Sequence, residues 1–356
     1  MSGGDEAAAR FAAAEGRSFM ARAFAAAGLP ETDAEMVAER MLFADLRGID
    51  SHGVVRLPVY IKRLRAGGIN RRPTIRIARE SPATALVDGD NGMGHLVMGF
   101  AARLAIAKAA ASGIGWVGAR RSNHAGAGAT YAMMPLAHDM IGLYLAVANI
   151  NHMAPWGGIE PLLGTNPIAV AVPTLDEPPV VLDIATTATS FGRIRVAAQN
   201  GERLPEGLVI DRTGAPVTDP LKAEEGLLLP MGGYKGYGLS LVLSLLGGAL
   251  NGTPVGRDSA GIPAADPANT GQAIMALNLA SFGPVEEFKR HVDRIVRDLR
   301  TSKPLPGGGE VRFPGQQGHR TATERGRSGI PIRPALRAEL GKLAAELGIA
   351  PLKLQS

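Results

Sequence analysis

The spacing of apolar residues changes once along this chain, close to Ile75. Up to that point they recur at helical spacing, which predicts three helices, over residues 6–27, from Thr32 until Gly48, and over residues 54–65. Beyond it, short runs of β-favouring residues alternate with helical stretches. Because strands that alternate with helices are typical of a sheet covered by helices, we expect a helical domain and an α/β (α+β) domain.

The second part of the chain carries the predicted sheet. Its predicted strands span residues 83–87, 114–119, 141–149, 168–172, 180–184 and 272–279, and its predicted helices span residues 95–111, 128–138, 236–250 and 285–299. Earlier in the chain, the helix start at Thr32 is predicted from Glu35 three positions later, the spacing of a capping box. A Pro- and Gly-rich passage over residues 303–320 is long for a simple connection, which favours a functional segment.

The last predicted helix, over residues 334–347, is amphipathic. Leu recurs along it at helical spacing, which suits packing against the N-terminal helices. We therefore expect residues 1–75 and 291–356 to form the helical domain together. Residues 76–290 are the predicted α/β domain.

Composition excludes several classes of protein. The chain has no Cys, so disulfide scaffolds, Cys-based metal sites and thiol nucleophiles are ruled out. Its net charge of +5 comes mostly from scattered Arg, and only 4% of residues are aromatic, which favours a small acidic ligand over nucleic acid. The first ten residues are polar, and no apolar run approaches about 18 residues, so we expect a cytoplasmic protein with no membrane partner.

Two polar clusters could carry chemistry. In the first, Arg56 follows His52 by one helical turn, so an imidazole and a guanidinium could converge on one anion; a helix cap with a surface Arg is the alternative. The second, residues 120–128, reads Arg-Arg-Ser-Asn-His-Ala-Gly-Ala-Gly between a predicted strand and a predicted helix. Backbone N–H groups at such a turn favour a phosphate, although a solvated connection has the same pattern.

Three further segments stand out. Residues 149–167 place Trp156 among several Pro and Gly residues, which fits a long turn or a pocket wall. Asp183 interrupts an apolar strand and needs a partner there, unless it caps the following turn. Residues 230–238 form a Gly-rich turn with one Lys before an apolar helix, which has the chemistry of a phosphate cradle but not the Walker spacing. No G-x-G-x-x-G follows a predicted strand, so a Rossmann domain is not supported.

Together these segments resemble the malate/L-lactate dehydrogenase family of the second type. Its relatives include sulfolactate and ureidoglycolate dehydrogenases, diketogulonate reductase and Δ1-piperideine-2-carboxylate reductase. The matching segments occur in the family's order, and they are residues 45–53, 56–58, 122–124, 154–158, 161–167, 183–186 and 233–236.

The resemblance implies a mostly helical domain formed by both chain ends and a larger, non-Rossmann α/β domain with a mixed sheet. It also implies that NAD or NADP binds in the interdomain cleft, usually within a homodimer, and that there is no metal. By position, Ser51, His52 and Asp183 correspond to a proton-relay group, with His124 as a second candidate for the acid/base role. Arg56 corresponds to the anchor of the substrate carboxylate and Thr165 to a further substrate contact. The cofactor contacts that it implies are His124, Ala125, Gly126, Ala127, Gly128, Asp183, Ile184, Ala185, Tyr234, Lys235, Pro314 and Gly315.

Some positions depart from the family pattern. Ala125 stands where relatives have a bulky aromatic residue, and Gln316 follows the Pro-Gly pair where they have Glu. Around Gln272 and Asn278, two aromatic residues and a carboxylate are also replaced. These changes leave the substrate open, and they leave the choice between NAD and NADP open as well.

The expected activity is hydride transfer between nicotinamide and a small 2-oxo or 2-hydroxy acid. His52 would exchange the proton that accompanies the hydride, while Arg56 holds the substrate carboxylate. Reduction of a cyclic imine or ketimine 2-carboxylate is the alternative, and a non-catalytic small-anion binder is the other class to consider. A hydrolase is disfavoured because the chain has neither a G-x-S-x-G nor an H-E-x-x-H motif.

Overall fold

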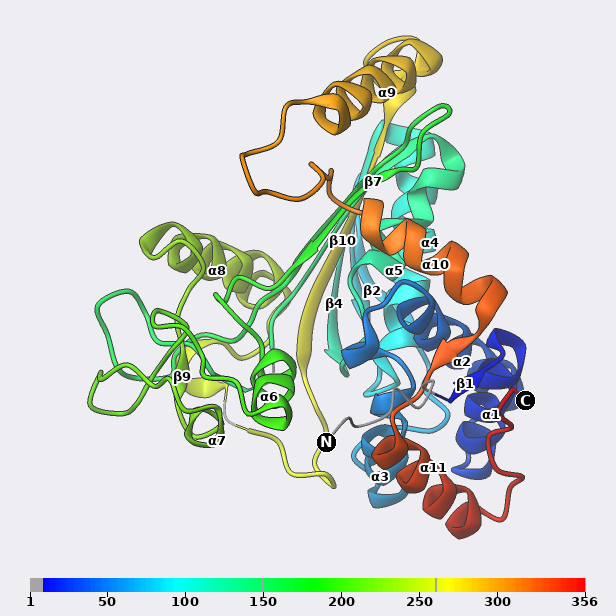
Figure 1. Ribbon diagram of the computed structural model, residues 1–356. Coiled ribbons are helices and arrows are strands. Elements are labelled where there is room, and N and C mark those ends of the chain that lie inside the picture. Colours follow the sequence, from blue (N-terminus) through cyan, green and yellow to red (C-terminus); the bar gives the residue numbers. More distant parts are fainter. Residues whose placement is uncertain (1–8, 149, 260, 356) are drawn as a thin grey trace.

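The computed structural model describes residues 9–148, 150–259 and 261–355, and a seven-stranded mixed sheet runs through its centre (Figure 1). The strands lie in the order β2-β3-β4-β10-β5-β6-β7. Only β3 and β4 are parallel, and every other neighbouring pair is antiparallel. The strands span Arg76–Glu80 (β2), Thr84–Asp88 (β3), Ile114–Ser122 (β4), Met140–Ala146 (β5), Ile168–Val172 (β6), Val180–Ile184 (β7) and Thr270–Asn278 (β10). The mixed sheet that the resemblance implies is therefore present.

Helices cover both faces of this sheet. The helix α4 (Gly94–Ser112) packs on β4 and β10, and α8 (Tyr234–Gly247) packs on β5 and β10 from the opposite face (Figure 1). β10 is buried along most of its length because it pairs on both sides and is covered on both faces. No helix in the described part of the chain has the length and apolar character needed to cross a bilayer.

The two chain ends share one apolar core beside the sheet (Figure 1). The helices α1 (Ala13–Ala26), α2 (Glu31–Leu46) and α3 (Leu57–Ala66) pack with α11 (Pro334–Leu347), and the strand β1 (Arg10–Phe11) pairs with β11 (Ile330–Pro331). Phe19 and Leu64 lie in the same buried cluster as Leu340 and Leu343. The expected boundary between residues 290 and 291 falls inside the continuous helix α9 (Val285–Thr301).

The remaining elements are short or peripheral. They are η1 (Asp50–His52), η2 (Val54–Arg56), α5 (Ala129–Ala132), η3 (Met134–His138), α6 (Phe191–Asn200), β8 (Val209–Ile210), α7 (Pro220–Ala223), β9 (Leu227–Leu228), η4 (Ala249–Asn251), η5 (Gly256–Asp258), η6 (Leu279–Ser281) and α10 (Gln316–Ser328). The helix α10 begins inside the Pro- and Gly-rich passage that the sequence presents as irregular.

The capping box predicted at the start of the second helix is wrong. The helix α2 begins at Glu31 with Pro30 at the N-cap position, and no side chain caps it. Thr32 already lies inside the first turn, so its hydroxyl cannot serve as the N-cap. The predicted first helix also starts too early, because Arg10 and Phe11 pair with β11; residues 6–8 lie outside the described residues, as does Asn149 at the end of the predicted third strand.

Candidate active site

Ser51 and His52 lie on the short turn η1, directly after α2. The Oγ atom of Ser51 is 2.8 Å from Nδ1 of His52, and Nε of Arg56 donates a 2.7 Å hydrogen bond to the carbonyl of Ser51. Burial lowers the pKa of His52 to about 4, and the positive charge of Arg56 acts in the same direction. His52 is therefore a neutral imidazole near pH 7.

The turn that carries these residues rests on a buried carboxyl group. Asp45 accepts a 2.8 Å hydrogen bond from the N–H of Val54, and a Cβ atom on Gly53 would lie 1.7 Å from its Oδ1 atom. Only glycine fits there without displacing Asp45. Burial raises the pKa of Asp45 to about 8, although the Val54 hydrogen bond opposes this shift.

Arg325 of α10 fastens the same turn from the C-terminal end of the chain. It donates a 2.5 Å hydrogen bond to the carbonyl of Asp45 and forms an ion pair with Asp50. The helix α10 thus takes part in building the site through Arg325, which lies just beyond the Pro- and Gly-rich passage over residues 303–320.

His124 lies against His52 from the loop after β4. The two rings stack, with centroids 5.4 Å apart and planes 23° from parallel. The hydroxyl of Tyr60 on α3 is 2.6 Å from Nδ1 of His124. Desolvation by the surrounding atoms lowers the pKa of His124 well below its usual value, and the neighbouring His52 and Arg56 add to the effect. The structure thus brings His52, His124 and Arg56 together.

The Gly-rich loop that follows His124 passes over a buried histidine. Gly126 has a φ of +75°, and a Cβ atom there would lie 2.9 Å from Nε2 of His95. His95 is fully buried, and neither of its ring nitrogens has a hydrogen-bond partner among the described residues. Ala125 is buried, and its carbonyl accepts a 2.5 Å hydrogen bond from the hydroxyl of Tyr131. Ala127 and Gly128 then lead into α5.

Asp183, at the end of β7, bonds to the backbone where this loop enters α5. Its Oδ2 atom accepts a 2.9 Å hydrogen bond from the N–H of Ala129, and Arg47 is its cationic neighbour. Among the described residues, no hydrogen bond joins Asp183 to Ser51 or His52. Burial raises the pKa of Asp183 to about 6, while the Ala129 hydrogen bond and Arg47 oppose the shift.

Two buried amide side chains hold the strand end before His124, and sequence reasoning missed the function of both. Gln272 accepts a 2.8 Å hydrogen bond from Ser122 and donates one of 3.2 Å to the carbonyl of Asn123. The side chain of Asn123 in turn donates to Asn91 and to the carbonyl of Gly92. Gln272 is one of the departures from the family pattern, and its role here is to position the loop.

The remaining predicted positions lie on neighbouring elements. The carbonyl of Thr165 accepts a 2.9 Å hydrogen bond from the N–H of Thr186, which follows the partly buried Ile184 and Ala185. Tyr234 and Lys235 are exposed on the first turn of α8. The carbonyl of Pro314 accepts a 2.9 Å hydrogen bond from Val181 on β7, with Gly315 beside the same residue.

One helix that the sequence did not predict also borders the site. A Cβ atom on Gly192, in the first turn of α6, would lie 3.8 Å from Cβ of Ser51. The only sequence signal for this helix is Ser190, whose hydroxyl caps it by accepting a hydrogen bond from Arg193.

Comparison with known proteins decides the family. The family model of malate/L-lactate dehydrogenase matches residues 11–341. The chain belongs to the malate/L-lactate dehydrogenase family. An L-sulfolactate dehydrogenase of Methanocaldococcus jannaschii is 41% identical over 90% of this chain and 92% of its own length. A malate dehydrogenase of Pyrococcus horikoshii is 39% identical over 94% of each chain.

A solved structure agrees with this assignment. The structure of malate dehydrogenase from Pyrococcus horikoshii OT3 matches with a TM-score of 0.90 at 35% identity, over 99% of both chains. Two more distant relatives show the range of the family. A ureidoglycolate dehydrogenase (NAD(+)) of Escherichia coli is 34% identical over 82% of this chain and 83% of its own length. A Δ1-pyrroline-2-carboxylate/Δ1-piperideine-2-carboxylate reductase of Pseudomonas putida is 31% identical over 89% and 91%.

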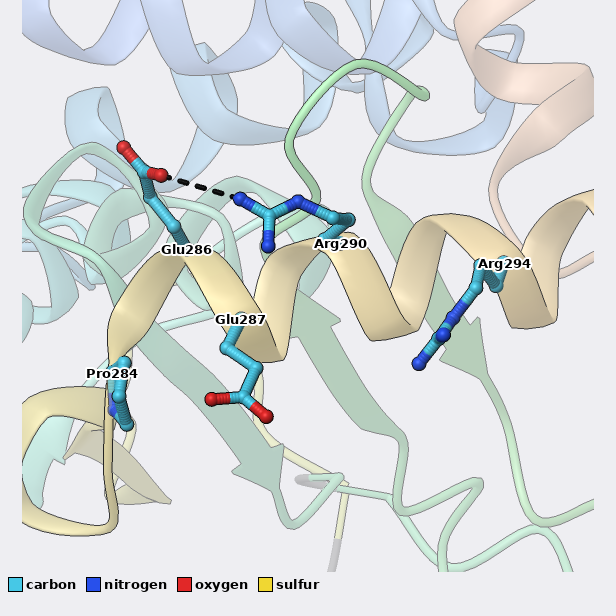
Figure 2. A pocket seen from close by; sticks show the side chains of 5 residues that line it. All are labelled: Pro284, Glu286, Glu287, Arg290 and Arg294. Carbon is cyan, nitrogen blue, oxygen red and sulfur yellow. Dashed lines mark hydrogen bonds and ion pairs between the residues drawn. The ribbon is translucent and has the colours of Figure 1, made fainter.

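The protein also has a surface hollow away from this site, and its lining contains no histidine. It lies along α9, and Figure 2 shows that Glu286, Glu287, Arg290 and Arg294 come from that one helix, with Pro284 just before it. Glu286 and Arg290 form an ion pair one helical turn apart. This is a solvated helix face, and the candidate site remains the group around His52.

Proposed function

We propose that this chain is an NAD(P)-dependent oxidoreductase that transfers a hydride between nicotinamide and a small 2-oxo or 2-hydroxy acid. The observation that carries the proposal is the approach of two imidazoles, His52 and His124, to the guanidinium of Arg56. A group that exchanges a proton and a group that binds a carboxylate therefore lie within one short stretch of the fold. The names of the relatives, malate and sulfolactate dehydrogenases, support the same substrate class.

Arg56 is suited to hold the substrate carboxylate. Its Nε atom donates a hydrogen bond to the carbonyl of Ser51. Its two terminal nitrogens make no hydrogen bond or ion pair among the described residues. A guanidinium with two free, parallel donors matches a carboxylate. Because the hydrogen bond to Ser51 fixes the orientation of the guanidinium at Nε, the guanidinium would orient the substrate as well as bind it. Thr165 would contact the substrate from the loop before β6.

His52 is suited to exchange the proton. Bound nicotinamide supplies or accepts the hydride. His52 is neutral near pH 7, so it can accept the proton of a 2-hydroxy acid during oxidation and return it during reduction. Ser51 holds Nδ1 of the ring, which leaves Nε2 for the substrate. A relay that includes Asp183 stays a prediction, because its carboxylate bonds to Ala129.

The residues assigned to the cofactor fit a dinucleotide. Gly126 lets the backbone run directly over His95, where any side chain would collide. At α8, Gly233 occupies the N-cap position with no side-chain cap, so the first N–H groups of the helix are available beside the exposed Lys235. Uncapped N–H groups and a cation suit a pyrophosphate. Since β3 and β4 form the sheet's one parallel pair, we infer a non-Rossmann mode of binding between the α/β and helical parts, the latter formed by residues 1–75 and 291–356.

We further propose that the protein is a cytoplasmic homodimer. The feature that supports a second copy is an exposed apolar face on α8. That face consists of Leu241, Val242, Leu245 and Leu246 on α8, and Leu250 on the adjoining η4 extends it. Exposed apolar patches of this kind on soluble proteins commonly mark interfaces.

A second candidate function is reduction of a cyclic imine or ketimine 2-carboxylate. The relative from Pseudomonas putida supports it, and the same Arg, His and hydride arrangement serves a C=N bond. The replacement of a bulky aromatic residue by Ala125 also favours a pocket of altered shape.

The test is the consumption of reduced cofactor. The purified protein is incubated separately with NADH and NADPH, and the absorbance of the reduced nicotinamide is followed with a panel of 2-oxo acids and then with cyclic imines. We expect oxidation with at least one 2-oxo acid. Oxidation with imines alone would select the second candidate, and no oxidation under any condition would contradict both.

A matched pair of variants checks the carboxylate anchor in the same assay. Arg56→Gln should raise KM for the 2-oxo acid by about tenfold or more, because it removes a charge-assisted bidentate contact. Val55→Ala, at the exposed preceding position, should leave KM near the wild-type value. An unchanged KM in Arg56→Gln would place the carboxylate elsewhere.

A further inference from the structure

Two hydrogen-bonding groups converge on one nitrogen of His124. The hydroxyl of Tyr60 lies 2.6 Å from Nδ1, and the backbone N–H of Gly126 points to the same atom at 3.3 Å. A backbone N–H can only donate, so Nδ1 must offer its lone pair. The Tyr60 hydroxyl must then donate to Nδ1 as well, and the ring proton of His124 resides on Nε2.

We propose that Tyr60 is a positioning residue that fixes His124 as the Nε2–H tautomer, so that His124 acts as a hydrogen-bond donor while His52 exchanges the proton. This inference rests on the proposed function. It assigns separate roles to two histidines that the sequence left as alternatives.

The surroundings of Tyr60 hold its hydroxyl in place. Tyr60 is buried on α3, and the ring of His95 packs edge-on against it, with centroids 5.4 Å apart. Burial raises the pKa of Tyr60, so the hydroxyl keeps its proton and remains a donor. On its other side, His95 faces Gly126, so one buried ring supports both the residue and the loop that bond to Nδ1.

His52 and His124 differ in their freedom to change protonation state. The partner of Nδ1 in His52 is the hydroxyl of Ser51, which can donate or accept and therefore suits either form of the ring. Protonation of Nδ1 in His124 would set its N–H against the N–H of Gly126. The geometry thus leaves proton exchange to His52.

The groups that face His124 oppose a second proton on it. His52 comes from η1, Arg56 from η2, Tyr60 from α3 and His95 from α4. None of these four side chains is a carboxylate. A neutral Nε2–H donor is well matched to the oxygen of a 2-oxo acid, or to the lone pair of an imine nitrogen, as that atom gains negative charge.

The test is the tautomer itself, measured by NMR on the full-length protein labelled with 15N-histidine. Long-range 1H–15N spectra at neutral pH distinguish a protonated from an unprotonated ring nitrogen, and His124→Gln identifies the relevant signals. We expect the Nε2–H pattern for His124. An Nδ1–H pattern in the wild-type protein would overturn the proposal.

A matched pair of tyrosine variants tests the cause. Tyr60→Phe should shift the His124 signals toward a mixture of tautomers and lower kcat roughly tenfold. Tyr131→Phe removes another buried hydroxyl, one that bonds to Ala125 in the same loop, and should leave the His124 tautomer unchanged. Identical His124 spectra in Tyr60→Phe and the wild type would also overturn the proposal. Because NMR needs no substrate, absence of turnover would count only against the proposed function.

Discussion

At the scale of single residues, the site depends on a carboxyl group that carries out no chemistry. Asp45 is buried under the η1 turn, accepts the N–H of Val54 and leaves no room for a side chain on Gly53. The position of Ser51 and His52 is therefore set by contacts that precede and follow them in the chain. A substitution at Gly53 would displace the reactive turn without touching either reactive side chain.

Asp45 also makes stability depend on pH in a defined direction. Its pKa is about 8 in the folded protein against an ordinary value of 3.8, so folding takes up a proton between about pH 4 and pH 8. The stabilising contribution of the neutral form is complete below this window and is lost as pH rises through it. Asp45→Asn cannot ionise and keeps an oxygen that can accept from Val54.

The wild type should therefore lose unfolding free energy relative to Asp45→Asn as pH rises from about 5 to about 8. Urea unfolding of both proteins at these two pH values measures the difference. Glu39→Gln, which removes an exposed carboxylate from the same helix, controls for the loss of one negative charge. A difference that is the same at both pH values would show that Asp45 is ionised in the folded protein.

The parts of the site that could be predicted are those whose contacts join residues close together in the sequence. His52 and Arg56 are four residues apart, so their proximity is a local property that spacing conveys. Tyr60, Gln272 and Arg325 support the site through contacts with residues far away in the sequence. Gln272 stands out as a departure from the family pattern, but nothing in the local sequence reveals any of these three contacts. The absence of a hydrogen bond between Asp183 and His52 has the same origin, since only the tertiary structure decides which partner a carboxylate meets.

At the scale of elements, the apolar periodicity of the sequence predicts the bounds of the most regular helices and strands. The strands β6 and β7 and the helix α11 have the predicted bounds, because each has a clear apolar pattern and contributes residues to a buried core. The strand β2 was missed because its sequence is mostly charged and it lies exposed at the edge of the sheet. The helix α10 was missed because its sequence is polar and follows a Gly-rich passage. It reaches the segment before the η1 turn through Arg325, a contact that only the tertiary structure shows.

At the scale of the whole molecule, the exposed face of α8 predicts association. It lies on the opposite side of the sheet from α4, and no described element covers it (Figure 1). If two copies pack through this face, the wild-type protein should elute as a dimer in size-exclusion chromatography with light scattering. Leu245→Glu should shift the population toward monomer, because it buries a charge in an apolar contact.

Leu221→Glu is the matched control for this experiment. Leu221 is 78% exposed on α7, outside the α8 face, so its replacement should leave the dimer intact. A monomeric wild-type protein, or a Leu245→Glu variant that remains fully dimeric, would show that this face has another use.

The central claim is that His52 exchanges the proton during hydride transfer, and one comparison tests it directly. The turnover numbers of His52→Ala and His124→Ala are measured side by side, with the 2-oxo acid and reduced cofactor that the wild type uses best. We expect His52→Ala to lose about a hundredfold or more in kcat. His124→Ala should lose less, because His124 only donates a hydrogen bond and does not exchange the proton. Near-normal turnover in His52→Ala together with loss of turnover in His124→Ala would contradict the account.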